Sequence, residues 1–150
     1  AVSNKCGKAR LFISRLIMRA QSFSEDNIRE CLGVVEVETI TLDEFFESAV
    51  GVEKVDFLKM DVQGAEGLVI EGAEKVFKGN NLKVLMEFCP YGLRNVGTDP
   101  LKLLQRLQDY GFKIKLVGNS STGCTEIQEI IAICESETGG KGQVNLFLEK

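Results

Sequence analysis

The stretch from Lys54 to Cys89 constrains the fold most, because it alternates apolar runs with an amphipathic segment. The run VDFLKMDV, residues 55–62, predicts a largely buried strand, and NLKVLMEFC, residues 81–89, predicts a second one. Between them, apolar or small residues recur at helical spacing: Ala65, Leu68, Val69, Gly72, Ala73, Val76 and Phe77. A strand, a helix and a strand in this order predict a parallel pair joined by a right-handed crossover.

Shorter patterns extend this α/β organisation in both directions. Thr41 and Glu44 form a capping box that opens a helix, and Pro100 follows a capping residue, Thr98 or Asp99, at the start of another. Residues 15–30 have no clean period and are expected to be a loop or insertion, and a loop is also expected around Pro90. The remaining predicted elements are strands 7–14, 34–41, 112–117 and 143–150, and helices 42–50, 100–110 and 125–134. Residues 125–134 fit a helix with Thr125 and Gln128 as a capping box, although their β-branched content also fits a strand. Gly79 is expected as the C-terminal cap of the helix that contains Phe77. The last two strands are expected to pair antiparallel.

Composition excludes several classes of protein. A length of 150 residues favours a single domain. The net charge of −4, with acids and bases interspersed, gives no basic face for nucleic acid. No run of 18 apolar residues is present, so no membrane-spanning helix is expected. The sequence has no histidine, which excludes mechanisms that need an imidazole base or ligand from this chain.

The cysteines favour a reducing compartment. Five are present, at positions 6, 31, 89, 124 and 134, and none forms a C-x-x-C pair. An odd number without such a pair argues against a disulfide framework and against a structural zinc site. We therefore expect reduced thiols and a cytoplasmic protein.

Polar residues gather where the two buried strands end. Asp61 ends the first strand and Glu87 the second, and Gln63, Gly64 and Glu66 follow Asp61. Ligands of open α/β sheets bind at the carboxyl ends of the strands, so neighbouring strands would open both carboxylates onto one crevice. An acid at a helix N-terminus can also be only a cap, which is the alternative for Glu66 and Asp61. Asp61, Glu66 and Glu87 together could instead hold a divalent cation through oxygen ligands.

Two residues after the second strand are weaker candidates. Tyr91 lies in the loop that follows Glu87 and is placed to contact a substrate or to pack the loop. Cys89 lies at the same strand end, but without a histidine to activate it a buried thiol is favoured.

The segments VETITLDEFF, VDFLKMDVQGAEGLVIEGAEKVF and LKVLMEF together resemble the FkbM family of S-adenosylmethionine-dependent methyltransferases. The family pattern is a T-L-D element, a strand ending in D-x-E/Q-G-x-E, a helix reading L-x-G-A and a strand ending in Glu. The opening AVSNKCGKARLF is similar to the family's A-x-S-x-x-x-G segment. The matching positions are Thr41, Leu42, Asp43, Asp61, Gln63, Gly64, Glu66, Gly72, Ala73 and Glu87.

This resemblance implies a doubly wound, Rossmann-like methyltransferase fold with a mostly parallel sheet, an antiparallel last strand and helices on both faces. It implies O-methyl transfer from S-adenosylmethionine to a small-molecule or sugar hydroxyl, with Asp61 and Glu66 catalytic and with Gln63, Glu87 and Tyr91 binding the acceptor. Gln63 stands where many relatives have Glu.

The family's glycine-rich turn after its first strand and acid after its second have no counterpart in the sequence. Residues 1–150 are therefore expected to be the carboxyl-terminal portion of such a domain, binding the cofactor weakly or not at all. Two alternatives remain open, a non-catalytic binding or assembly module and an oxygen-ligand metal enzyme. The flank of strand 55–62 is also expected to be exposed, which predicts a homodimer through a sheet edge.

Overall fold

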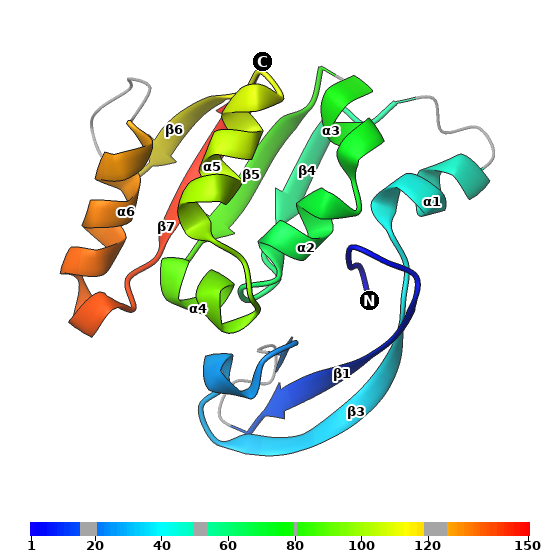
Figure 1. Cartoon of the computed structure of the whole chain (residues 1–150), viewed down its shortest axis with the longest axis vertical. Helices are drawn as coiled ribbons and strands as arrows, with labels where there is room; N and C mark the ends of the chain where they lie inside the picture. The colour runs from blue at the N-terminus through cyan, green and yellow to red at the C-terminus, as the bar shows by residue number, and fades with distance from the viewer. Residues whose placement is uncertain (16–20, 50–53, 80, 119–125) are drawn as a thin grey trace.

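A computed structural model describes residues 1–15, 21–49, 54–79, 81–118 and 126–150, and their strands form two separate sheets (Figure 1). None of the described helices has the length and apolar character needed to cross a membrane. In chain order the elements are β1 (Gly7–Ser14), β2 (Gln21–Ser22), the 3-10 helix η1 (Glu25–Asn27), β3 (Cys31–Thr39), α1 (Leu42–Ser48), β4 (Phe57–Met60), α2 (Glu66–Glu71), α3 (Glu74–Gly79), β5 (Lys83–Phe88), α4 (Pro90–Asn95), α5 (Pro100–Asp109), β6 (Lys113–Val117), α6 (Ile127–Ser136), the 3-10 helix η2 (Thr138–Gly140) and β7 (Val144–Glu149).

The larger sheet has the strand order β4-β5-β7-β6. Strands β4 and β5 run parallel, as the strand–helix–strand pattern predicts. Strand β7 lies between β5 and β6 and is antiparallel to both, which confirms the expected antiparallel pairing of the last two strands. The expectation of a mostly parallel sheet is wrong for the described residues, because the insertion of β7 leaves β4–β5 as the parallel pair of a mixed sheet.

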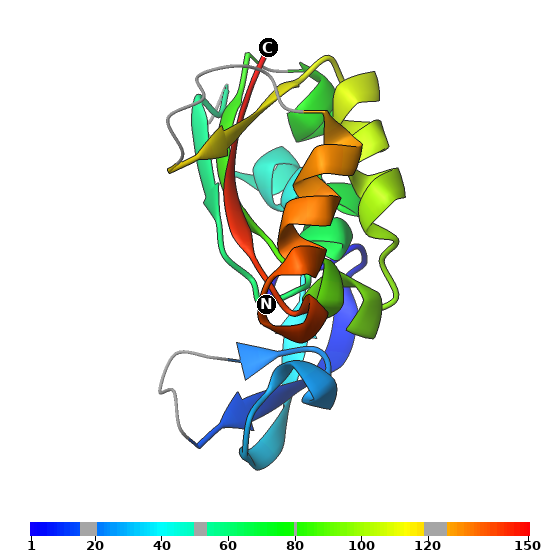
Figure 2. The ribbon, with the colours of Figure 1, turned by 90° about the vertical axis from the view of Figure 1, so that its left-hand side faces the viewer.

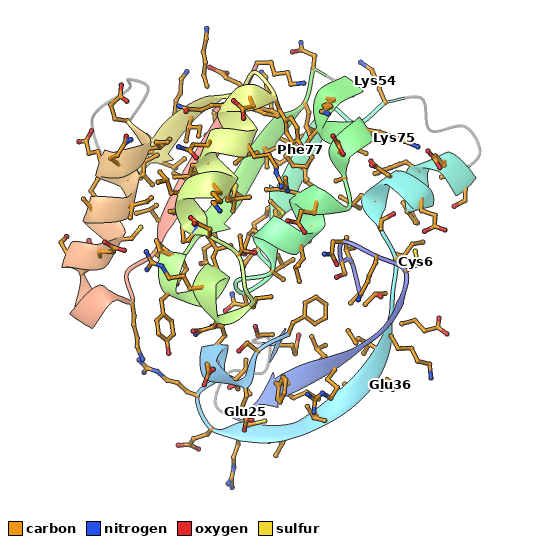
Figure 3. The ribbon with its side chains drawn as sticks, viewed as in Figure 1. Cys6, Glu25, Glu36, Lys54, Lys75 and Phe77 are labelled. Carbon is orange, nitrogen blue, oxygen red and sulfur yellow. The ribbon has the colours of Figure 1, made fainter. Side chains whose placement is uncertain are left out.

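Helices α2 to α6 pack on one face of this sheet, as the view along the sheet shows (Figure 2). Alternate strand residues point toward them and are fully buried, including Val84, Met86 and Leu146. Phe77 of α3, labelled in Figure 3, is fully buried and packs edge-on against Phe112, their ring centroids 5.7 Å apart. Burying each such side chain contributes about 1.5–3 kcal/mol to stability. The expectation of helices on both faces is wrong for the part of this sheet and its helices that the structure describes. The face away from the helices carries Phe57 and Val117, which are both exposed.

The smaller sheet, which we call the arm, comprises β1, β2 and β3 in the order β2-β1-β3, all antiparallel. The sequence predicts strands at 7–14 and 34–41 but not that they leave the main sheet to pair with each other. Strand β3 begins at Cys31, earlier than predicted, because its pairing with β1 extends to this residue. Gly33 pairs with Ile13, and after a shift in register Cys31 pairs with Ser14. The arm lies beneath the carboxyl ends of β4 and β5 (Figure 1).

The helix predicted after β4 is divided into α2 and α3 at Gly72 and Ala73. At Gly72 a side chain is excluded, since a Cβ atom would lie 2.2 Å from the carbonyl oxygen of Ser3. Helix α3 then starts afresh under its own cap, because the Asp43 carboxylate accepts hydrogen bonds from the amides of Lys75 and Val76 at 3.0–3.1 Å. Gly79, expected as a C-terminal cap, is the last residue of α3.

The capping residues explain where the other helices begin and how these positions compare with the predictions. Thr41 Oγ1 accepts from the Glu44 amide at 3.0 Å, which confirms the capping box of α1, and Asp99 caps α5 as one of the two predicted residues. The loop expected around Pro90 is wrong, because Pro90 takes the first position of helix α4, where its missing N–H costs nothing. Helix α6 confirms the helix predicted near 125–134, although the capping residue predicted there, Thr125, and also Cys124, lie outside the described residues.

Candidate active site

Asp61 and Glu87 emerge together at one rim of the main sheet. Met60 and Met86 are the last register partners of the parallel pair β4–β5. Asp61 follows the end of β4, and Glu87 continues β5 opposite Asn145 of β7, so the two acids lie at the same end of the pair. The side-chain amide of Gln63 donates to Asp61 Oδ1 at 2.9 Å and to Glu87 Oε2 at 3.4 Å. This bridge brings together three of the residues singled out from the sequence.

Glu87 is the more enclosed of the two acids. Its other oxygen, Oε1, accepts from the Gln143 amide at 2.9 Å, so a glutamine holds each side of the carboxylate. Burial raises the pKa of Glu87, the negative charge of Asp61 raises it further, and Lys59 opposes both effects. Asp61 keeps 45% of its side chain exposed and lies 3.5 Å from Lys59 Nζ. The rim thus presents one accessible carboxylate and one that is half-buried.

The chain turns sharply between Asp61 and α2. Gln63 has a φ of 51° and Gly64 a φ of 93°, both in the left-handed region. Strained backbone of this kind persists only where surrounding contacts hold it, and it concentrates at functional sites. Here the carboxylate of Glu66 holds the turn, because its Oε1 accepts from the amides of Val62 at 3.2 Å and Gly64 at 3.4 Å.

Glu66 itself is almost completely buried, with 1% of its surface exposed. Its second oxygen, Oε2, has no hydrogen-bond partner among the described residues. Burial raises the pKa of Glu66, and the backbone amides that it accepts from only partly offset this effect. The carboxylate is therefore directed at its own loop rather than into the space shared by Asp61 and Glu87.

A cavity of about 210 Å³ opens beside the rim. Gln63 and Glu87 line it from the main sheet, Tyr91 and Cys89 from the start of α4, and Gln143 from the segment before β7. The ring of Tyr91 lies under Lys141, whose Nζ is 4.5 Å from the ring centroid. Three of the residues predicted to form the site, Gln63, Glu87 and Tyr91, therefore line one cavity, and Asp61 is joined to it through its hydrogen bond from Gln63.

The arm supplies a residue that the sequence does not reveal. Asn27 of η1 donates from its side-chain nitrogen to the carbonyl oxygens of Gln63 and Gly92, both at 3.0 Å, and its oxygen accepts from Asn95. Asn27 thereby ties the arm to the strained loop and to α4, and it lines the cavity. It lies in the 15–30 segment that shows no period, so no sequence signal marks it. Gln143 is likewise unmarked.

The metal alternative finds no support in this geometry. Among the residues that the structure describes, no group of three or more histidine, cysteine, aspartate or glutamate side chains is arranged to hold a metal ion. Glu66, the third acid of that hypothesis, is bound to the amides of Val62 and Gly64 instead.

Residues 3–114 match the model of the methyltransferase FkbM domain, which places the protein in the methyltransferase class. The match spans most of the chain, and the chain therefore belongs to the FkbM methyltransferase family. Comparison with curated proteins and with solved structures gave no match.

The structure gives physical roles to several positions of the family pattern. Thr41 and Asp43 of the T-L-D element cap α1 and α3. Gly64 has no room for a side chain, because a Cβ atom would lie 2.5 Å from the Gly92 carbonyl oxygen. Asp61 and Glu87 have no comparable structural role, which distinguishes them as candidates for chemistry.

Proposed function

We propose that this chain carries the acceptor side of an S-adenosylmethionine-dependent methyl transfer to a hydroxyl group of a small molecule or sugar. The observation that carries the proposal is the pair of carboxylates bridged by Gln63 at the rim of the cavity, in a chain of the FkbM family. The four described cysteines are free thiols, which supports a cytoplasmic location.

The cavity beside the rim does not enclose a whole cofactor. Sites for small molecules usually measure about 300–1,000 Å³, whereas this cavity measures about 210 Å³. S-adenosylmethionine, when bound, would supply the methyl group. The residues of this chain are assigned to the acceptor alone.

Three residues are proposed to hold the acceptor. The half-buried Glu87 carboxylate can accept from a sugar or alcohol hydroxyl, and the Gln63 amide is oriented between the two acids. Tyr91 lines the same cavity, with the Lys141 ammonium over its ring. Fixing a hydroxyl between such groups aligns its oxygen for attack, and alignment of this kind can supply much of the rate of a transfer reaction.

Asp61 is proposed to take the proton. As the acceptor oxygen forms its bond to the methyl carbon, the hydroxyl must lose a proton, and the partly exposed Asp61 carboxylate is the nearest base to the Gln63 bridge. For Glu66 we propose a positioning role, since its carboxylate holds the amides of Val62 and Gly64 and so fixes the conformation from which Gln63 reaches both acids.

Methyl transfer from radiolabelled S-adenosylmethionine to a panel of sugars and small alcohols tests the proposal. We expect Asp61→Asn to lower the rate about 100-fold or more, as loss of a general base does. Asp56→Asn is the matched control, because Asp56 precedes the other end of β4 and its side chain is 74% exposed. Equal rates in the Asp61→Asn variant and the unchanged chain would reject Asp61 as the base.

The alternative is a non-catalytic binding module, which the small volume of the cavity favours. Saccharide binding that Asp61→Asn leaves unchanged, with no methyl transfer to any acceptor, would support this alternative. Rate loss in Asp61→Asn with retained acceptor binding would support the enzyme.

A further inference from the structure

The outer edge of β3 is unlike the other sheet edges of the molecule. The two sheets have four edge strands among the described residues: β2, β3, β4 and β6. Natural proteins protect such edges by keeping them short or by placing lysines on them. β2 has two residues, β4 has four with Lys59 among them, and β6 carries Lys113 and Lys115. β3 has nine residues and no lysine or arginine.

The first part of this edge, before Glu36 and Glu38, is apolar or uncharged and exposed. Leu32 is 66% exposed, Val34 46% and Val35 41%. Among the described residues, only β1 pairs with 31–37, whereas the end of β3 has the N-terminal residues beside it, where the Ala1 amino group donates to the Glu38 carbonyl. In Figure 1, β3 forms the outer boundary of the arm, and Glu36, labelled in Figure 3, marks this strand. The backbone of 31–37 is therefore accessible to another strand.

The sequence of this edge is complementary to itself. In an antiparallel pair related by a two-fold axis, the residue on the axis lies opposite its own copy, and like charges opposite each other are unfavourable. An axis at Glu36 would oppose two glutamates. An axis at Val34 or Val35 opposes valine to valine and places Glu36 opposite Leu32 or Val34 of the second copy. Glu36 is already paired with Lys8 at 2.6 Å, so its charge is balanced within its own arm.

We propose that the arm is a dimerisation surface on which a second copy of this chain pairs antiparallel with β3, about a two-fold axis at Val34 or Val35. The pairing joins two three-stranded arms into one six-stranded antiparallel sheet and covers the exposed valines of both. It places the homodimer at the β3 edge, not at the β4 edge that the sequence pattern suggests. The inference does not depend on the proposed methyl transfer.

The mass in solution gives the first test. A contact limited to residues 31–37 of each copy is small for a protein interface. We therefore expect a dissociation constant of about 1 μM to 1 mM. Sedimentation over that range should show the mass rising from 16.6 kDa toward twice that value. Val35→Lys places two lysines directly opposite each other for an axis at Val35, or diagonally across the pair for an axis at Val34, and should raise the dissociation constant about 100-fold. A single-chain mass at every concentration would overturn the proposal.

Phe57→Lys is the matched control, because Phe57 is a comparably exposed apolar residue on the β4 edge. It should leave the dimer intact. Dissociation by Phe57→Lys but not by Val35→Lys would place the interface at β4 and overturn the proposal. Circular dichroism and the melting temperature establish that each variant is folded.

Cysteine cross-linking gives a second test that does not depend on the lysine variants. In a chain with Cys6, Cys31 and Cys124 changed to serine, single cysteines are introduced by Val34→Cys and by Val35→Cys. Directly opposite residues of paired strands lie about 4.5–5.5 Å apart, within the range of a disulfide. With a mild oxidant such as oxidised glutathione, one variant should form a disulfide dimer and the other should not, since only the residue on the axis meets its own copy. Cross-linking of neither, or of both equally, would overturn the proposal.

Discussion

Gly64 occupies a position in which a side chain would meet both strain and a steric clash. Its φ of 93° disfavours any residue with a Cβ atom, and that atom would lie 2.5 Å from the Gly92 carbonyl oxygen. Gly97 has a similar φ of 86°, but nothing lies within 4 Å of the place that a Cβ atom would take there. Comparing the two glycines therefore distinguishes two effects. Backbone strain is present at both positions, whereas the close approach of another chain segment is present only at Gly64.

We expect Gly64→Ala to lower the free energy of unfolding by about 3 kcal/mol and Gly97→Ala by about 1 kcal/mol. The difference arises because Gly64 must also move away from the Gly92 carbonyl. Urea denaturation of both variants measures it. Equal losses would mean that the loop after β4 can shift without cost.

Glu66 predicts a dependence of stability on pH. Burial raises the pKa of Glu66 in the folded chain above its ordinary value of 4.5. The folded state therefore binds a proton more readily than the unfolded state, and this contribution to stability is complete below pH 4.5 and is lost as the pH rises through the folded pKa.

Glu66→Gln removes this titration but keeps an oxygen for the amides of Val62 and Gly64. Between pH 4.5 and neutrality, the unchanged chain should lose stability relative to the Glu66→Gln variant. Urea denaturation at a series of pH values gives the comparison. Parallel curves for the two proteins would contradict the expected effect of burial on this carboxyl.

At the scale of elements, Asp43 explains why a continuous helical pattern becomes two helices. Residues 65–79 keep their apolar spacing through the break, so the pattern alone predicts one helix. The break follows from the packing of Gly72 against Ser3 and from the cap that Asp43, distant in sequence, gives to α3. An interaction over this separation leaves no mark on local periodicity.

Asp43→Ala should lower the free energy of unfolding by about 1–2 kcal/mol, since it removes the acceptor for the first amides of α3. Asp56→Ala serves as the control, because the Asp56 side chain forms an exposed pair with Lys54 and such pairs contribute about 0–1 kcal/mol. Thermal and urea denaturation measure both. A loss no larger than that of the control would show that α3 does not depend on this cap.

At the scale of the whole molecule, the proposed acceptor site lies at a cavity smaller than the usual volume of a small-molecule site. The cavity of about 210 Å³ lies between the main sheet, α4 and the arm, and Asn27 closes it from the arm side. Whatever binds there is expected to be small or to be held only in part.

We therefore expect S-adenosylmethionine at about 1 mM to raise the melting temperature by less than about 1 °C, as a ligand with a dissociation constant near or above that concentration does. A saturating rise of several degrees would show that the cofactor binds fully to this chain. Differential scanning fluorimetry, with adenosine as a comparison ligand, makes the measurement.

The sequence by itself determined the local elements and the family. Apolar periodicity and capping residues specify β4, β5, α1 and α5, because these features depend on neighbours within a few residues. The two carboxylates at the strand ends followed from the same reasoning, since parallel neighbours end at one rim.

Only the tertiary structure decided how the elements combine. The separation of the arm, the insertion of β7 between β5 and β6, and the contacts of Asn27 with Gln63 and Gly92 all join residues far apart in the chain. The tertiary structure also decided that the Glu66 carboxylate binds the amide of Val62 in its own loop, whereas Asp61 and Glu87 both accept a hydrogen bond from Gln63. Long-range pairing and burial select among arrangements that local patterns permit equally, which is why these features had to come from the folded chain.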